Sequence, residues 1–141
     1  MKKLAFPLLL LITVTFTQCT NAVDEELKTL DAQLMEGHDT VMPQSMGLVK
    51  LKDDVLAAAA AGDSTMKNQA ATIANNLQTA EDDMYKWMDD YSAAMNDEQD
   101  KEKKLEMYHK LKVDIDRIST DTENSMKAAK DFIAQNVIVE E

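Results

Sequence analysis

The sequence predicts an all-α protein, an up-down-up bundle of three long helices. Two observations indicate this fold. Helix-favouring residues dominate, aromatic residues make up only 5% of the chain and β-branched runs are absent from the three periodic segments, so the composition favours helix over sheet. Apolar residues also recur at alternating spacings of three and four along three segments. This repeat is typical of helices that pack against near-parallel neighbours.

The chain opens with a segment that is typical of a secretory signal. Lys2 and Lys3 form a short basic region, and an apolar run follows from Leu4 to Phe16. That run is short for a spanning helix, which needs about 20 apolar residues. Residues 1–18 are therefore expected to be a lipoprotein signal peptide. Residues 19–24 are expected to be an anchor and short linker, and residues 25–141 the helical bundle domain.

The only cysteine lies at the end of this segment. The stretch "FTQC" resembles the lipobox of bacterial lipoproteins, in which the cysteine, here Cys19, is acylated and begins the mature chain. This resemblance implies a lipid-anchored protein of the cell envelope of a Gram-negative bacterium, on the outer membrane. The alternative is cleavage after Ala22, which would release a soluble periplasmic protein. In both cases catalysis by a cysteine thiol is not expected.

The first helix is expected to bend. Pro43 lacks an amide hydrogen and crowds the turn before it, so a kink is expected near Pro43, within residues 39–43. Gly37 and Gly47 flank this region and weaken the helix further. The apolar seam, meaning the positions of this helix that repeat at spacings of three and four, is interrupted by Gly37 and Gln44, which are not apolar. It comprises Leu27, Leu30, Leu34, Gly37, Val41, Gln44, Leu48, Leu51 and Val55.

The second and third helices carry unbroken seams. Gly62 is expected to cap the end of the first helix, and Asp63 or Ser64 the start of the second. Residues 96–102 turn the chain into the third helix. Helices of roughly 35 to 40 residues make a bundle about 50 Å long. The seams are Met66, Ala70, Ile73, Leu77, Ala80, Met84, Trp87, Tyr91 and Ala94, then Tyr108, Leu111, Ile115, Ile118, Thr122, Ser125, Ala129 and Phe132.

The predicted bundle places several side chains that could bind a soft metal ion at one level along its axis. Met35, His38, Met42 and Met46 follow helical spacing, and counting from both turns brings further residues to their level. Imidazole and thioether groups suit monovalent copper in an oxidising compartment, and a tryptophan face could shield the ion. Core packing by methionine is the alternative. The layer comprises His38, Met42, Met84, Trp87, Met88, Met107, Tyr108 and His109, of which His38, Met42, Met88 and Met107 are the candidate ligands and Trp87 the shield.

Two resemblances bear on this layer. The stretch "HDTVMPQSMGLVKLK" and the later "WMDDY" resemble a family of small secreted helical lipoproteins of Gram-negative bacteria, usually called viral A-type inclusion protein. This resemblance implies a helical fold and an envelope location, and no established activity. The ligand chemistry, though not the fold, is similar to that of periplasmic copper chaperones. The residues that carry the family pattern are His38, Asp39, Val41, Met42, Pro43, Met46, Trp87 and Met88.

The net charge and the motif content of the sequence argue against several classes of function. The net charge of −11 argues against nucleic acid and anionic lipid headgroups as partners. Phosphate-binding loops and nucleophile or metalloprotease motifs are absent from the sequence, so we expect no enzyme activity. The first interpretation is a lipid-anchored, non-enzymatic bundle that contacts an unknown envelope protein through an acidic face or the region around Pro43. The alternatives are a periplasmic copper-binding protein and a homo-oligomer formed through the heptad faces.

Overall fold

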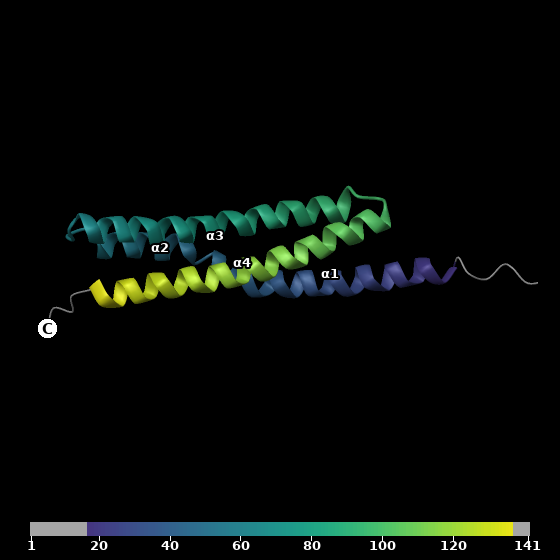
Figure 1. Ribbon diagram of the computed structural model, residues 1–141, viewed down its shortest axis with the longest axis horizontal. Coiled ribbons are helices and arrows are strands. Elements are labelled where there is room, and N and C mark those ends of the chain that lie inside the picture. Colours follow the sequence, from purple (N-terminus) through teal and green to yellow (C-terminus); the bar gives the residue numbers. More distant parts are fainter. Residues whose placement is uncertain (1–16, 137–141) are drawn as a thin grey trace, which may run out of the picture.

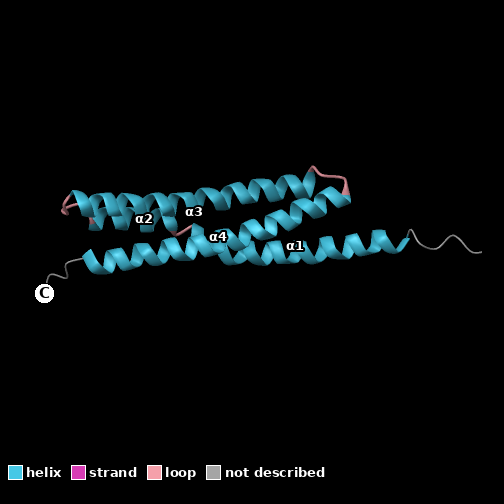
Figure 2. Cartoon of the chain, in the orientation of Figure 1, coloured by secondary structure: helices cyan, strands magenta, loops and turns pink. Residues whose placement is uncertain are grey.

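The computed structural model describes residues 17–136, with side chains from residue 22 onward. Residues 1–16 of the predicted signal peptide and the side chain of Cys19 lie outside this part. The predicted bundle of three helices is confirmed, with the first helix bent by 34° into two segments. Figure 1 shows the long, slender bundle, and Figure 2 shows that only short connections interrupt the helices. The helices are α1 (Thr17–Ser45), α2 (Leu48–Ala58), α3 (Ser64–Asn96) and α4 (Lys101–Asn136).

The direction of the helices sets their neighbours. α1 and α4 run the same way and lie against each other, while α3 runs back between the two turns (Figure 1). α1 makes few close backbone approaches to α3, whereas α2 packs on both α3 and α4. No helix between residues 17 and 136 combines the length and the apolar character that crossing a membrane requires. The backbone of residues 19–24 lies within α1, which begins at Thr17.

The bend lies a few residues beyond Pro43. α1 continues through Pro43 to Ser45, and the helix breaks at Met46 and Gly47. At the break the amide of Gly47 donates to the carbonyl of Gln44 at 3.0 Å, one residue closer than in an α-helix. Pro43 therefore weakens the hydrogen-bond ladder without ending it, and the chain turns where glycine follows.

Gly37 does not take part in the kink. It lies inside the regular part of α1, where α1 approaches α4 closely. A Cβ atom at Gly37 would lie 2.8 Å from Cγ1 and 3.1 Å from Cγ2 of Ile115. The expectation that Gly37 bends the helix is therefore wrong: its missing side chain makes room for Ile115 of the neighbouring helix.

The predicted seams form the core. Their members on α3 and α4 are buried or partly buried throughout, and on the first helix the one exchange is that Ser45, rather than Gln44, occupies the fully buried position. The core divides into two apolar clusters. The first joins α1, α3 and α4 and consists of Leu30, Leu34, Val41, Met84, Trp87, Ala94, Tyr108, Leu111, Ile115 and Ile118. The second joins α2, α3 and α4 and consists of Leu48, Val55, Ala59, Ala70, Ile73, Leu77, Ala80, Ala129 and Phe132.

Two buried hydroxyls separate these clusters. Ser45 falls between Val41 and Leu48 along the chain, and Thr122 falls between Ile118 and Ala129. The parallel helices α1 and α4 approach each other at Gly37 and Ile115. Ser45 and Thr122 follow these two residues at nearly equal distances along their helices, so the two hydroxyls lie at about the same level. Within the described residues, neither Ser45 Oγ nor Thr122 Oγ1 has a hydrogen-bond partner. The boundary between the two cores is thus a polar level at the helix break.

The turns between helices differ in part from expectation. Asp63 caps α3 as predicted, since its side chain accepts a hydrogen bond of 2.9 Å from the amide of Met66. Gly62 is not the C-cap of the preceding helix, which ends at Ala58 with Ala59 as its cap. Gly62 instead leaves room for the side chain of Met66, whose sulfur would collide with any Cβ at this position.

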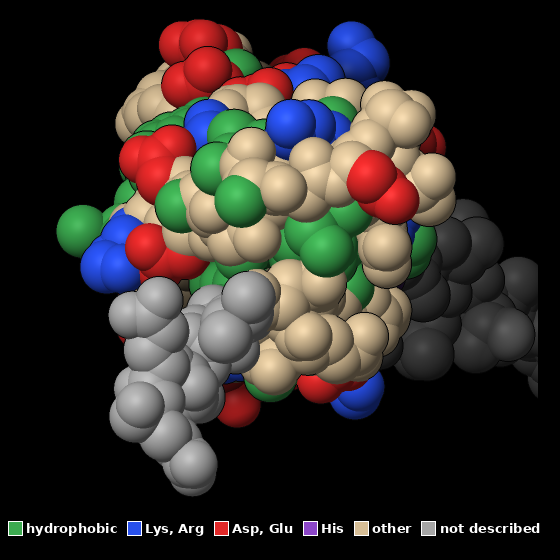
Figure 3. Space-filling model, turned by 90° about the vertical axis from the view of Figure 1, so that its left-hand side faces the viewer, with side chains coloured by type: hydrophobic (Ala, Val, Ile, Leu, Met, Phe, Trp, Pro, Cys, Tyr) green, Lys and Arg blue, Asp and Glu red, His purple; other side chains and the backbone are tan. Residues whose placement is uncertain are grey.

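The surface at the α2–α3 end of the bundle carries both signs of charge. On the face that Figure 3 shows, acidic, basic and apolar side chains are interspersed. Most ion pairs along the helices join residues four apart, such as Lys50 with Asp54 and Lys127 with Asp131, and both pairs are exposed. Exposed pairs of this kind contribute about 0.3–0.5 kcal/mol each, so packing of the seams, not surface charge, stabilises the fold.

Candidate functional site

Trp87 lies at the centre of the predicted layer. Its ring is almost completely buried in the first core cluster, on the inward face of α3. Its indole Nε1–H donates a hydrogen bond of 2.8 Å to the carbonyl oxygen of Leu111 in α4. The ring is therefore fixed at both its apolar face and its one polar atom, as buried tryptophans require.

Aromatic rings extend from Trp87 toward the other two helices. The rings of His38 and Trp87 stack with a centroid distance of 6.3 Å and an angle of 28°. Trp87 also stacks on Tyr91 of the next turn, at 5.4 Å and 4°, and Tyr91 meets Tyr108 of α4 at 6.0 Å. These side chains connect α1 with α3, whose backbones make few close approaches. The predicted meeting of His38 with Trp87 is confirmed.

A carboxylate holds the far end of this row of rings. The hydroxyl of Tyr91 donates a hydrogen bond of 2.7 Å to Oδ1 of Asp31 in α1. Burial, followed by this hydrogen bond, raises the pKa of Tyr91 well above its usual range. Burial, followed by the charge of Asp31, raises the pKa of Tyr108 to about 12. Sequence reasoning placed Tyr91 on the seam but missed Asp31, because nothing marks one acid among 26 as facing inward.

These shifts predict a loss of stability at high pH. Both tyrosines titrate later in the folded state than the value of about 10 in an unfolded chain. Their contribution to stability is thus complete below pH 10 and is lost as pH rises toward 12. We expect the free energy of unfolding, measured in urea by circular dichroism, to fall across this interval. The variant Asp31→Asn should lower both pKa values in a phenolate absorbance titration, whereas an unchanged titration would contradict the assigned role of Asp31.

The candidate ligands do not all lie at one level. Met42 and Met88 are partly buried against the same cluster as Trp87. Met107 packs there too, but Trp87 meets α4 at Leu111, one turn beyond Met107. The predicted register between α3 and α4 is therefore wrong by about one turn. The cause is that counting took Asp97 as the turning point, whereas the connection between α3 and α4 extends over residues 97–100 and its middle lies later in the chain.

His109 points away from the layer. Its Nε2 lies 3.0 Å from Oε1 of Glu26 in α1, and both side chains are about half exposed. It joins α1 to α4 near the α3–α4 end of the bundle, close to the contact of Lys101 with Asp24. The layer around Trp87 thus keeps one of the two histidines and loses the other to the surface.

The surroundings of His38 leave one ring nitrogen available. Nδ1 of His38 lies 3.0 Å from Oδ1 of Asp39, and the side chain is 25% exposed. In the tautomer that donates from Nδ1 to this carboxylate, Nε2 carries the lone pair. A carboxylate at the other nitrogen is the usual outer partner of a metal-binding histidine. His38 is therefore able to act as a neutral imidazole ligand through Nε2.

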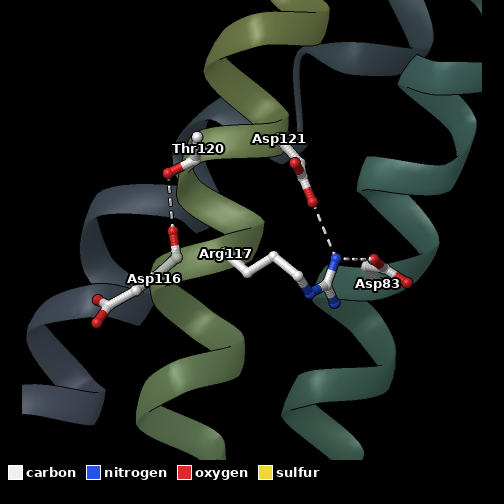
Figure 4. Close-up of polar contacts among 5 residues, drawn as sticks. All are labelled: Asp83, Asp116, Arg117, Thr120 and Asp121. Atoms are coloured by element: carbon white, nitrogen blue, oxygen red, sulfur yellow. Dashed lines mark hydrogen bonds and ion pairs between the residues drawn. The ribbon is translucent and has the colours of Figure 1, made fainter.

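Charged side chains join α3 and α4 on the outside of the same region. Arg117 of α4 reaches Asp83 of α3 at 2.8 Å and Asp121 of its own helix at 2.9 Å (Figure 4). The hydrogen bond to Asp83 is the main cause that raises the pKa of Arg117. Both carboxylates pair with the same guanidinium, so this cluster is a surface ion-pair contact between α3 and α4.

Hard metal ions find no ready site in the part of the chain that the structure describes. There, no three His, Cys, Asp or Glu side chains come together closely enough to hold a metal ion. A site at the Trp87 layer would have to use the thioethers of methionine, which select soft ions such as monovalent copper. Of the candidate ligands, His38 stacks on Trp87, and Met42 and Met88, like Met107, are partly buried against the cluster that contains Trp87.

Comparison of the chain with known protein families, with curated proteins and with solved structures finds no match. Function must therefore be inferred from the geometry of this layer.

Proposed function

We propose that the protein is a non-enzymatic, lipid-anchored helical bundle of the cell envelope that binds one monovalent copper ion. The ligands in this proposal are His38, Met42 and Met88, with Trp87 as the shield. The observation that supports it best is the stacking of His38 of α1 on Trp87 of α3 at 6.3 Å, between two helices with few close backbone contacts.

The chemistry of these residues fits copper(I). Met42 lies one helical turn from His38 on the same face of α1, and Met88 follows Trp87 directly in α3. One imidazole and two thioethers form a soft, neutral ligand set, which suits a monovalent ion. The face of the indole ring attracts a desolvated cation, an interaction worth about 2 kcal/mol when water is excluded.

The position of the layer fits reversible binding. Its ligands are partly buried rather than fully enclosed, so an ion reaches them from the surface of α1. The acidic surface of the chain, with a net charge of −11, also concentrates cations near the site. Attachment through acylated Cys19 would hold this site at the membrane, since a doubly or triply acylated chain binds firmly.

Competition with a chromogenic copper(I) chelator under reducing conditions tests the proposal, with native mass spectrometry to count the ions. We expect one copper per chain. The variants His38→Gln and Met42→Leu should each weaken binding by about 10- to 100-fold, because each removes one ligand while preserving most of the side-chain volume.

Met126→Leu is the matched control, because Met126 is a partly buried methionine of the second core cluster, far from Trp87 in the sequence and in the bundle. It should bind copper like the wild type. Equal losses in all three variants, or no retained copper in the wild type, would overturn the proposal.

A second candidate function is contact with an envelope protein. The observation that favours it is an apolar strip at and beyond the helix break, where Met46, Val49 and Leu56 are exposed by 70%, 45% and 45%. If the wild type retains no copper, site-specific crosslinking from Val49 in the intact envelope tests this candidate. A discrete crosslinked product that is absent when the crosslinker is placed at Val113, an exposed residue on α4, would support it.

A further inference from the structure

Met46 lies beside the proposed copper site but outside its ligand set. We infer that Met46 is the exchange ligand of this site. It passes copper(I) between the partly buried ligands and a partner that offers thiol or thioether groups. The inference rests on the proposed function and adds to it the route by which the ion arrives and leaves.

The backbone fixes Met46 next to the site. Its amide donates to the carbonyl of Met42 at 3.1 Å, which is the α-helical step of four residues. Side chains four residues apart lie one above the other on the same helix face. Met46 therefore continues the line that runs from His38 through Met42.

Met46 is the exposed end of this line. His38 and Met42 are both partly buried, whereas Met46 is 70% exposed. With Val113, Met46 is the most exposed of the large apolar side chains in the described residues. A thioether at this place extends the soft ligands of the site into solvent, where a second molecule has access to it.

The helix break explains why Met46 stays uncovered. The chain turns at Gly47, which has no side chain, and α2 leaves at an angle of 34° to α1. The next side chain of the seam, Leu48, is buried in the second cluster and so points away from the surface. The bend thus serves the site by presenting one methionine at its outer edge.

The chemistry of the partner follows from that of the ion. Copper(I) moves between proteins by ligand replacement, in which a new soft donor binds before an old one departs, and thiolate or thioether groups are the donors that it prefers. Met46 provides the transient ligand on this chain. A ligand that acts only during exchange changes both binding and release rates by the same factor and leaves the equilibrium unchanged.

Stopped-flow transfer of copper(I) from the loaded protein to bicinchoninate, an aromatic nitrogen chelator, and to reduced glutathione, a thiol, measures the exchange rate. Met46→Leu keeps the apolar volume and removes the sulfur. We expect it to slow transfer to both acceptors by about tenfold, while the dissociation constant changes by less than about twofold. Met95→Leu is the matched control, because Met95 is exposed by 44% at the end of α3, distant from the site.

The outcomes separate this inference from the proposed function. Copper binding with equal transfer rates in Met46→Leu, Met95→Leu and the wild type would overturn the exchange role and leave the binding site intact. A weaker dissociation constant in Met46→Leu would make Met46 a resident ligand, which also overturns the inference. Failure of the wild type to bind copper would overturn both.

Discussion

Replacing Trp87 by alanine is expected to lower the free energy of unfolding by about 3–5 kcal/mol, the usual cost of removing a large buried aromatic side chain. Trp87 is 2% exposed and contacts residues of all three long helices. Its loss leaves a cavity where α1 and α3 have few other contacts. Urea unfolding followed by circular dichroism measures the effect without relying on the fluorescence of the residue that is changed.

Two further variants separate the contributions of Trp87. Trp87→Phe keeps an aromatic ring but removes the hydrogen bond to the Leu111 carbonyl. A cost of about 1–2 kcal/mol is expected from that bond and the smaller ring. Tyr85→Ala, two residues away on the exposed side of α3, should change stability by less than about 0.5 kcal/mol. Equal costs at Trp87 and Tyr85 would show that the ring row does not join the helices.

Replacing Gly37 by alanine is expected to destabilise the protein, although alanine is the better helix former. The added Cβ would lie 2.8 Å from Cγ1 of Ile115, a fully buried side chain that would have to shift. Overpacking of this kind costs about 1–3 kcal/mol, and the gain in helix propensity offsets up to about 1 kcal/mol. Urea unfolding should therefore show a net loss of up to about 2 kcal/mol.

Gly47 offers a matched control for Gly37. It has a helical backbone conformation, and a Cβ there would meet only the Gln44 carbonyl oxygen at an ordinary 3.4 Å. Gly47→Ala should change stability by less than about 0.5 kcal/mol. In an Ile115→Ala background the cost of Gly37→Ala should disappear, because both close atoms are gone. Persistence of the full cost there would assign it to the α1 backbone instead.

The fold could be predicted because it depends on local patterns. Alternating spacings of three and four identify the buried side of each helix, and the turn residues around Asp63 mark a helix start. The place of the bend could not be derived in the same way. A proline weakens several hydrogen bonds at once, and the chain bends where packing permits, here at Gly47. The role of Gly37 depends on a contact with α4 that sequence spacing does not encode.

The site could be predicted only in part, for a geometric reason. The meeting of His38 with Trp87 followed from counting across a short turn. The same counting across residues 97–100 failed, because a turning point placed at Asp97, at the start of the connection, shifts the expected level of every residue in α4 along the helix axis. Met107 and His109 were therefore placed beside Trp87, whereas Leu111 is the residue of α4 that meets its indole nitrogen.

The polar level of Ser45 and Thr122 has a consequence for how the bundle opens. Buried hydroxyls without partners weaken the cohesion between the apolar clusters on either side of them. We therefore expect the two halves to open with different free energies, measured as different protection of their backbone amides against hydrogen exchange. An ion held beside Trp87 would slow exchange in the half that contains α1 and leave the half that contains α2 nearly unaltered. Amide exchange at one end of the bundle would then depend on whether the ion is bound, while exchange at the other end would not.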